Sequence, residues 1–145
     1  MTPSTPIFLA SDTWILVALL WATTDKADVS LVELIRAADT VNHAIISRSE
    51  LETGFARLVS AGHATCSEKR YAPSPAIREF WSNETKGEKS LYDSWTALGS
   101  HIGAARARSG SIPDTEQERY VSKEAYAAAV AGYAMNMSHP FLGQK

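Results

Sequence analysis

The stretch SRSELETGFARLVSAGHATCSEKRYAPS, Ser47–Ser74, carries the signals of a helix followed by a β-hairpin. It opens with a capping box, SRSE, in which the Ser47 hydroxyl and the Glu50 carboxylate can satisfy free amides at a helix N-terminus. Apolar residues then recur at helical spacing and predict one buried stripe: Leu51, Phe55 and Leu58. Gly62 is a typical residue after a helix end. HATC and RYAP predict two short strands around a charged turn.

The residues on either side of this stretch predict three more helices. Residues 11–22 are apolar on nearly every side, which predicts a central helix capped by Ser11 or Asp12. A second capping box, SLVE at 30–33, opens a helix that should end near residues 42–43. Ser74 followed by Pro75 is typical of the cap and first residue of a short helix.

Two further helices are expected in the C-terminal part, over 91–102 and from Ser122 onward, separated by the polar segment RSGSIPDTEQE. Each has an apolar stripe, and the two together contain Trp95, Leu98, Ile102, Tyr126, Val130 and Tyr133. The chain is therefore divided into an N-terminal arm (1–10), a first domain (11–83) and a C-terminal helical extension (84–145).

Composition indicates a globular protein with an ordinary core. The 145 residues are 45% hydrophobic and 21% charged. The formal net charge is −2, so the chain lacks the excess of positive charge that is typical of nucleic-acid-binding proteins. The apolar run WILVALLWA is under half of the ~20 residues that a membrane-spanning helix needs, which predicts a buried helix. Cys66 is the single cysteine, which excludes an internal disulfide and fits a cytoplasmic location.

The order helix, helix, turn, helix, hairpin, helix resembles the winged helix-turn-helix superfamily of many bacterial transcription regulators. The resemblance rests on SLVELIRAADTVNHAIISRSELETGFARLVSAGHATC and the KRYAPSP hairpin, and it covers about half the chain. It implies a mainly α fold with a small two-stranded β-wing. It also implies a third helix (48–61) that reads DNA and a wing (68–70) near the phosphates. Winged helices also serve as protein-interaction modules, so the fold leaves the activity open.

If the protein binds DNA, the outward face of the third helix should supply base contacts. With Leu51 at the centre of the buried face, Ser49, Thr53 and Arg57 fall on the outer face, where they could bond base edges. Arg48, together with Lys69 and Arg70 at the wing tip, would contact phosphates. On this hypothesis the protein is a transcription regulator that binds double-stranded DNA.

Charge favours the alternative hypothesis, a protein–protein interaction module with no nucleic-acid role. Between residues 30 and 82 six basic residues are balanced by six acidic ones, although DNA affinity depends largely on phosphate neutralisation. Glu50 and Glu52 lie near the helix start that would enter the groove. A continuous basic face would support DNA binding, and acidic side chains interrupting it would support the alternative.

No motif indicates an enzyme, a cofactor or a metal site. The four histidines are dispersed, and no Walker A loop, GxGxxG, GxSxG, HExxH or paired CxxC occurs. Cys66 is interpreted as a small buried strand residue; a redox-sensing thiol would need exposure and a lowered pKa.

Small residues in the last two helices suggest close helix packing. Gly99 and Gly103 are four apart, as are Ala128 and Gly132, and this spacing lets helix axes approach. The two apolar stripes must cover each other, the core or a second chain, since a soluble monomer rarely leaves so large a patch exposed. A homodimer built mainly by residues after Lys89 is predicted.

Overall fold

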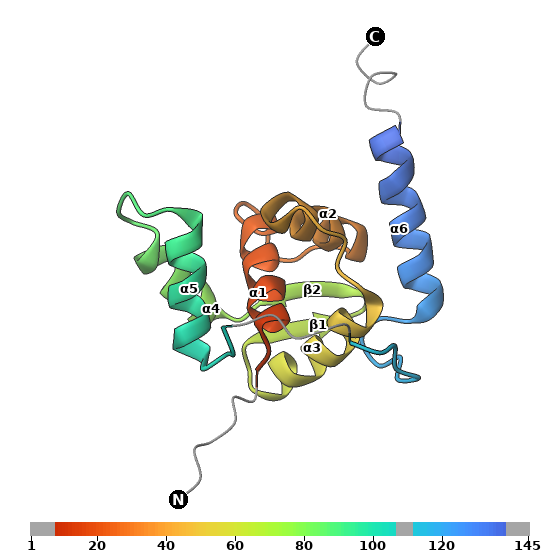
Figure 1. Ribbon diagram of the computed structural model, residues 1–145, viewed down its shortest axis with the longest axis horizontal. Coiled ribbons are helices and arrows are strands. Elements are labelled where there is room, and N and C mark those ends of the chain that lie inside the picture. Colours follow the sequence, from red (N-terminus) through yellow and green to blue (C-terminus); the bar gives the residue numbers. More distant parts are fainter. Residues whose placement is uncertain (1–7, 107–111, 139–145) are drawn as a thin grey trace, which may run out of the picture.

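The computed structural model describes residues 8–106 and 112–138 (Figure 1). Within them the chain is mainly helical, with one small antiparallel sheet, as predicted. The elements follow in the order α1 (Ala10–Ala22), α2 (Leu31–Asn42), α3 (Arg48–Ser60), β1 (Ala64–Ser67), β2 (Arg70–Pro73), α4 (Pro75–Glu84), α5 (Leu91–Ile102) and α6 (Lys123–Ser138). Residues 1–7 of the expected N-terminal arm lie outside the described residues.

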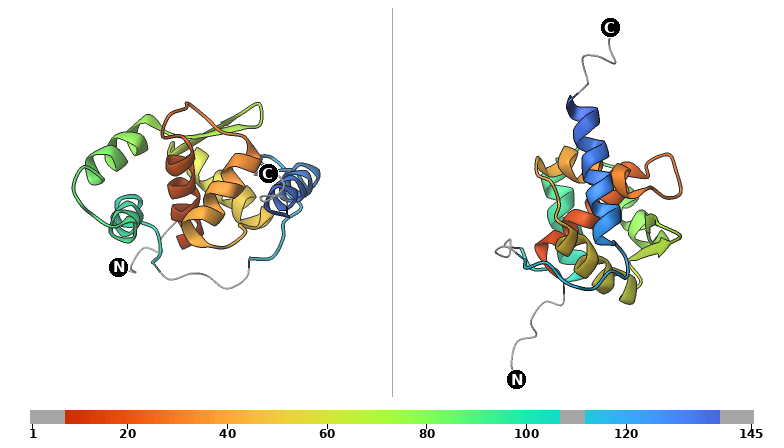
Figure 2. Two further views of the ribbon diagram at one scale, coloured as in Figure 1. Left: turned by 90° about the horizontal axis from the view of Figure 1, so that it is seen from above. Right: turned by 90° about the vertical axis from the view of Figure 1, so that its right-hand side faces the viewer.

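Helix α1 is the centre of the fold, as its all-round apolar sequence predicts. Its residues from Asp12 to Leu20 are all buried, because α2, α3, the hairpin and α5 each pack against it (Figures 1 and 2). The core therefore surrounds a helix and not a sheet face. The indole Nε1–H of Trp14 donates to the Ala38 carbonyl on α2 at 2.9 Å, which satisfies a buried polar group of α1.

The helix starts read from the sequence are confirmed for α2, α3 and α4. Ser30, Ser47 and Ser74 each accept a hydrogen bond from the amide three residues later. The expected cap of α1 is wrong, because the helix begins earlier and its N-cap residue is Leu9. The Asp12 carboxylate instead accepts from the Leu9 amide at 2.9 Å. Asp12, which was expected to cap the helix, thus bonds the backbone amide of the N-cap residue Leu9.

The predicted hairpin forms, although its first strand starts and ends one residue later than expected, which leaves a tight two-residue turn. Ala64 pairs with Pro73 and Ser67 with Arg70, and Glu68 and Lys69 between them have φ of 51° and 63°. Both turn residues are left-handed, which suits the twist of a two-residue hairpin. On its other side, Tyr71 exchanges two backbone hydrogen bonds with Val29, each 2.9 Å long.

Helices α5 and α6 pack on opposite sides of the same core (Figure 2). Leu98 and Ile102 of α5 are buried beside α1, and Tyr133 of α6 is buried beside α2. The two apolar stripes therefore cover the core and not each other. The core extends across residue 83, where the sequence suggested a division between domain and extension.

The glycines of α5 have reasons within one chain. A Cβ at Gly99 would lie 3.4 Å from Thr13 Oγ1 on α1, so Gly99 lets α5 approach α1 closely. Gly103 caps α5 with φ of 76°, a left-handed conformation that glycine adopts without strain. Neither observation requires a second chain, and the homodimer stays a prediction.

The burial of Phe55 tests which face of α3 is turned towards the core. Its side chain is fully buried, with its ring centroid 4.9 Å from that of Tyr71. Phe55→Ala should lower the free energy of unfolding by about 3–5 kcal/mol, because it leaves a cavity in the core. Urea unfolding followed by circular dichroism measures this loss, with Ile45→Ala, at a half-exposed position, as the control. A loss below about 1 kcal/mol for Phe55→Ala would contradict the packing described.

Glu33 should make stability depend on pH at the start of α2. Its hydrogen bonds with Lys26 and with the Ser30 amide lower its pKa from 4.5 to about 2. A lowered folded-state pKa contributes stability that is present above pH 4.5 and is lost as pH falls towards 2. Glu33→Gln keeps a capping side chain but removes the charge.

The expected cost of Glu33→Gln at pH 7 is below about 1 kcal/mol, because the ion pair is surface-exposed. Urea unfolding of both proteins at pH 7, 4 and 2.5 should show the difference shrinking as pH falls. A difference that stays constant over this range would mean that the charge of Glu33 contributes nothing to stability.

Candidate functional site

The first turn of the α3 face that the sequence assigned to DNA is covered by another part of the chain. Residues 112–122, here named the crossing segment, run beside α3 before α6 begins (Figures 1 and 2). Two charged side chains of α3, Arg48 and Glu52, hold this segment through its backbone. They are one helical turn apart and therefore point to the same side of α3.

Arg48 donates hydrogen bonds to three carbonyls and one carboxylate of the crossing segment. Its Nη1 bonds the carbonyls of Gln117 at 2.8 Å and Val121 at 2.7 Å. Its Nη2 bonds the carbonyl of Thr115 and, at 3.0 Å, the carboxylate of Asp114. The Arg48 side chain is 5% exposed. In this arrangement the guanidinium expected to contact phosphates is almost completely covered and bonded within the chain.

Glu52 accepts hydrogen bonds from backbone amides of the same segment, whereas the Arg48 guanidinium can only donate. Its Oε1 receives the N–H groups of Tyr120 and Val121, both at 2.8 Å, and its Oε2 receives that of Arg119 at 3.1 Å. The residue is 2% exposed. Guanidinium and carboxylate thus form complementary halves of one clamp, and charge-assisted hydrogen bonds to the crossing segment offset the desolvation of each.

The two small polar residues assigned to base contacts are also engaged within the chain. Ser49 is 3% exposed, and its hydroxyl donates to the Ile112 carbonyl at 3.0 Å. The Thr53 hydroxyl donates to the Ser49 carbonyl at 2.6 Å. Ser49 is thus covered by the crossing segment, whereas Thr53 is half-buried.

Arg57 is directed towards the core and not away from it. Its Nε and Nη2 donate to the two oxygens of Asp12, at 2.7 and 2.9 Å, in a two-pronged ion pair. Asp12 is fully buried at the start of α1, and a buried carboxylate without a partner would be strongly destabilising. The pair therefore neutralises Arg57 and joins α1 to α3.

At the wing, Arg70 and Lys69 differ. Arg70 Nε donates to the Asp28 carboxylate at 2.9 Å. Lys69 is exposed at the turn and makes no ion pair with any described residue. Of the six residues proposed for DNA, Lys69 is the one whose charge remains unneutralised by the part of the chain that the structure describes. The structure does not bring the six together as one basic face.

What remains open on α3 is a groove. It has a volume of about 960 Å3 and is lined by α3 residues with small or polar side chains, by Phe8 and by the crossing segment. Its lining includes Thr53, Ala56, Arg57, Ser60, Gln117, Arg119 and Tyr120. Arg119 lies over the ring of Tyr120, 5.4 Å from its centroid. The groove therefore combines apolar walls with a few polar groups.

The sequence analysis did not identify Asp12 as the partner of Arg57, nor Glu52 as an acceptor for the crossing segment. Asp12 is the one charged residue within α1, an unusual position for a buried helix, and this signal predicts a buried ion pair. Glu52 has no comparable signal, because its partners are backbone amides 67 to 69 residues away.

Other candidate chemistry is sparse among the described residues. No group of three or more potential metal ligands forms there. Cys66 is half-buried on β1, and burial, followed by the nearby charge of Glu52, raises the pKa of its thiol. A raised pKa opposes a reactive thiolate.

Comparisons with known proteins add no assignment: no protein-family model, curated protein or solved structure matches the chain. None of the helices within the described residues has the length and apolar character needed to cross a bilayer.

The clamp leads to a prediction for Glu52→Gln. The amide side chain keeps one acceptor oxygen, so at least one backbone N–H of the crossing segment is left without a partner. The free energy of unfolding should fall by about 1–3 kcal/mol. Hydrogen exchange of the Arg119, Tyr120 and Val121 amides should accelerate more than that of the Val29 and Tyr71 amides, which bond each other. Equal acceleration at both places would indicate general destabilisation and contradict a local clamp.

Proposed function

We propose that this chain is a winged-helix protein-interaction module whose docking surface is the groove along α3. The observation that supports this most directly is the crossing segment, which lies against the face of α3 that would otherwise enter DNA. The clamp of Arg48 and Glu52 holds it there with backbone hydrogen bonds. The groove left beside it offers walls on which a peptide segment of a partner protein can pack.

A comparison of sizes argues against major-groove reading by α3 in this conformation. A helix with its side chains is about 10–12 Å across, and the major groove of DNA is about 12 Å wide. A segment lying alongside the helix, within hydrogen-bonding distance of Ser49, leaves no room for insertion. Peptide binding in the α3 groove does not require α3 to be inserted into a partner, because the peptide approaches the side of the helix that the crossing segment leaves open.

Electrostatics supports the same choice. Arg48, Arg57 and Arg70 each form an ion pair with an aspartate of the same chain: Asp114, Asp12 and Asp28. DNA binding gains its affinity from cations that neutralise phosphates and release counterions. Cations that are already neutralised within the chain contribute little to that term.

Site-specific cross-linking tests the groove. A photo-reactive amino acid at Ala56, an exposed position in the groove, should yield one defined protein adduct in extracts of the source cells. The same probe at Trp21, an exposed position on α1, is the matched control and should not yield that adduct. Adding Ser60→Trp to the Ala56 probe should remove it, because the indole fills the groove. An adduct that persists in this variant would contradict docking in the groove.

DNA binding by a dimeric transcription regulator is the second candidate function. It is favoured by the helix-turn-helix order and by Lys69, which is exposed at the wing tip. Binding of genomic DNA fragments at low salt tests it. Replacing Lys69 and Arg70 with Ala should then weaken binding to all sequences alike and reduce its salt dependence, because phosphate contacts carry no sequence information. No shift of any fragment at low salt would exclude this function.

A further inference from the structure

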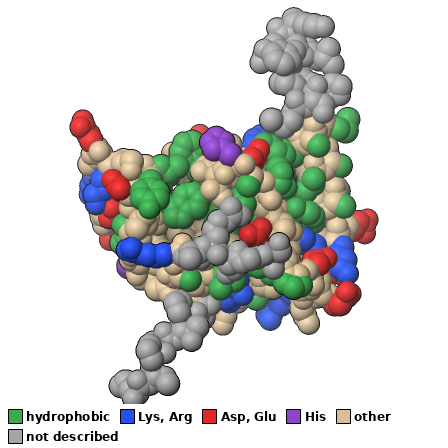
Figure 3. All heavy atoms as spheres, in the orientation of Figure 1, with side chains coloured by type: hydrophobic (Ala, Val, Ile, Leu, Met, Phe, Trp, Pro, Cys, Tyr) green, Lys and Arg blue, Asp and Glu red, His purple; other side chains and the backbone are tan. Residues whose placement is uncertain are grey.

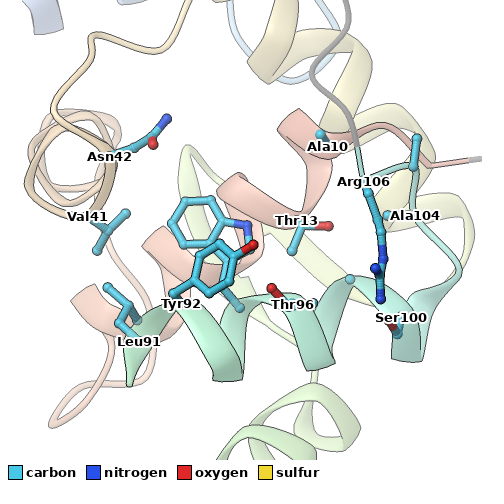
Figure 4. Close-up of a pocket in the computed structure, with 13 residues that line it drawn as sticks. Ala10, Thr13, Val41, Asn42, Leu91, Tyr92, Thr96, Ser100, Ala104 and Arg106 are labelled. Atoms are coloured by element: carbon cyan, nitrogen blue, oxygen red, sulfur yellow. The ribbon is translucent and has the colours of Figure 1, made fainter. Parts of the chain in front are cut away.

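A second cavity shares no lining residue with the α3 groove. It is formed by α1, the C-terminal end of α2, helix α5 and the residues after α5, and its volume is about 390 Å3. Figure 3 shows hydrophobic side chains gathered on this face, and Figure 4 shows the residues around the cavity. Cavities that bind small molecules have volumes of about 300–1,000 Å3, so this one lies at the small end of that range.

Thr13 lies in the wall of the cavity, but its hydroxyl is not open to a ligand. The residue is 2% exposed, and its Oγ1 has almost no accessible surface and makes no hydrogen bond with any described residue. A Cβ at Gly99 would lie 3.4 Å from that oxygen, so α5 packs closely against it. Polar recognition of a ligand therefore has to come from other residues of the cavity.

The rest of the wall is apolar and partly aromatic. Tyr92 and Trp95 are three residues apart on α5 and line the same cavity as Leu91 and Val41. Tyr92 is 77% exposed, an unusual position for a large aromatic side chain that has no partner to cover it. Two aromatic rings beside the cavity favour a planar ligand, since stacked or edge-on ring contacts contribute beyond simple burial.

Charge defines the ligand further. Arg106 is the one ionisable cation, and the one charged side chain, among the described residues that line the cavity. It lies at one end, beside Ser100, whereas Asn42 lies at the other (Figure 4). A guanidinium there can bond a carboxylate with two parallel hydrogen bonds. Among the described residues that line the cavity, none has an acidic side chain that would oppose an anion.

We propose that this cavity binds a small planar aromatic carboxylate. Its ring packs between α5 and α1 against Trp95 and Tyr92, and its carboxylate meets Arg106. The site shares no lining residue with the α3 groove. It joins α5 to α1 and to the end of α2, so an occupied cavity stabilises the packing of α5 on the core.

The test is an NMR titration of the full chain with 2-naphthoate, using 2-naphthamide as the neutral counterpart and cyclohexanecarboxylate as the acid without an aromatic ring. The indole N–H signal of Trp95, assigned through Trp95→Phe, reports the cavity; the signals of the other three tryptophans are internal controls. The Trp95 signal should shift saturably with 2-naphthoate, with a Kd below about 1 mM for a ligand of this size. Both comparison compounds should bind at least about fivefold more weakly.

Two variants test the role of charge. Arg106→Gln should raise the Kd of 2-naphthoate about fivefold, as expected for an exposed ion pair, and leave that of 2-naphthamide unchanged. Lys123→Gln, on the side of α6, removes a positive charge elsewhere and should change neither Kd.

Two results would overturn the proposal. One is no saturable shift of the Trp95 signal with 2-naphthoate up to 5 mM, a ceiling about fivefold above the expected Kd. The other is equal affinity for the acid and the amide, which would remove the role of Arg106. Neither result bears on the α3 groove, so the cross-linking experiment remains a separate test.

Discussion

A helix that is apolar on every side has to be covered on every side, and this constraint organises the whole molecule. From Asp12 to Leu20, α1 has no residue that faces solvent. The three-helix arrangement with the hairpin covers part of it, and α5 covers another part from beyond the polar linker. The C-terminal segments are therefore components of the core. Residues such as Leu98 and Tyr133 are buried in it as fully as those of the first half.

The same constraint determines the fate of the basic residues. Asp12 lies at the end of α1 that meets α3, where its carboxylate is fully buried, and such a charge is tolerated only with a partner. Arg57 is that partner, and it is therefore turned inward by the electrostatic need of a different helix. A charged residue that a helical wheel places on the outer face can thus be neutralised by a buried residue of another helix.

The clamp between α3 and the crossing segment explains how the face of α3 can be polar and yet covered. A loop that lies on a helix carries backbone N–H and C=O groups that must be satisfied. Arg48 supplies donors and Glu52 supplies acceptors, so one turn of helix serves both kinds of group. Together these two side chains let α3 bind the backbone of an extended segment. Under the function proposed above, the adjoining groove binds a segment of another protein.

The sequence by itself determined the elements and their local ends. Capping boxes at Ser30 and Ser47, the Ser74–Pro75 start and the two-strand hairpin are short-range features, set by hydrogen bonds within a few residues, and each was predicted correctly. The burial of Phe55 also followed from spacing alone. Only the tertiary structure decided what covers each face. The partners of Arg48, Glu52 and Arg57 are 45 to 73 residues away, and neither periodicity nor capping carries information over such separations.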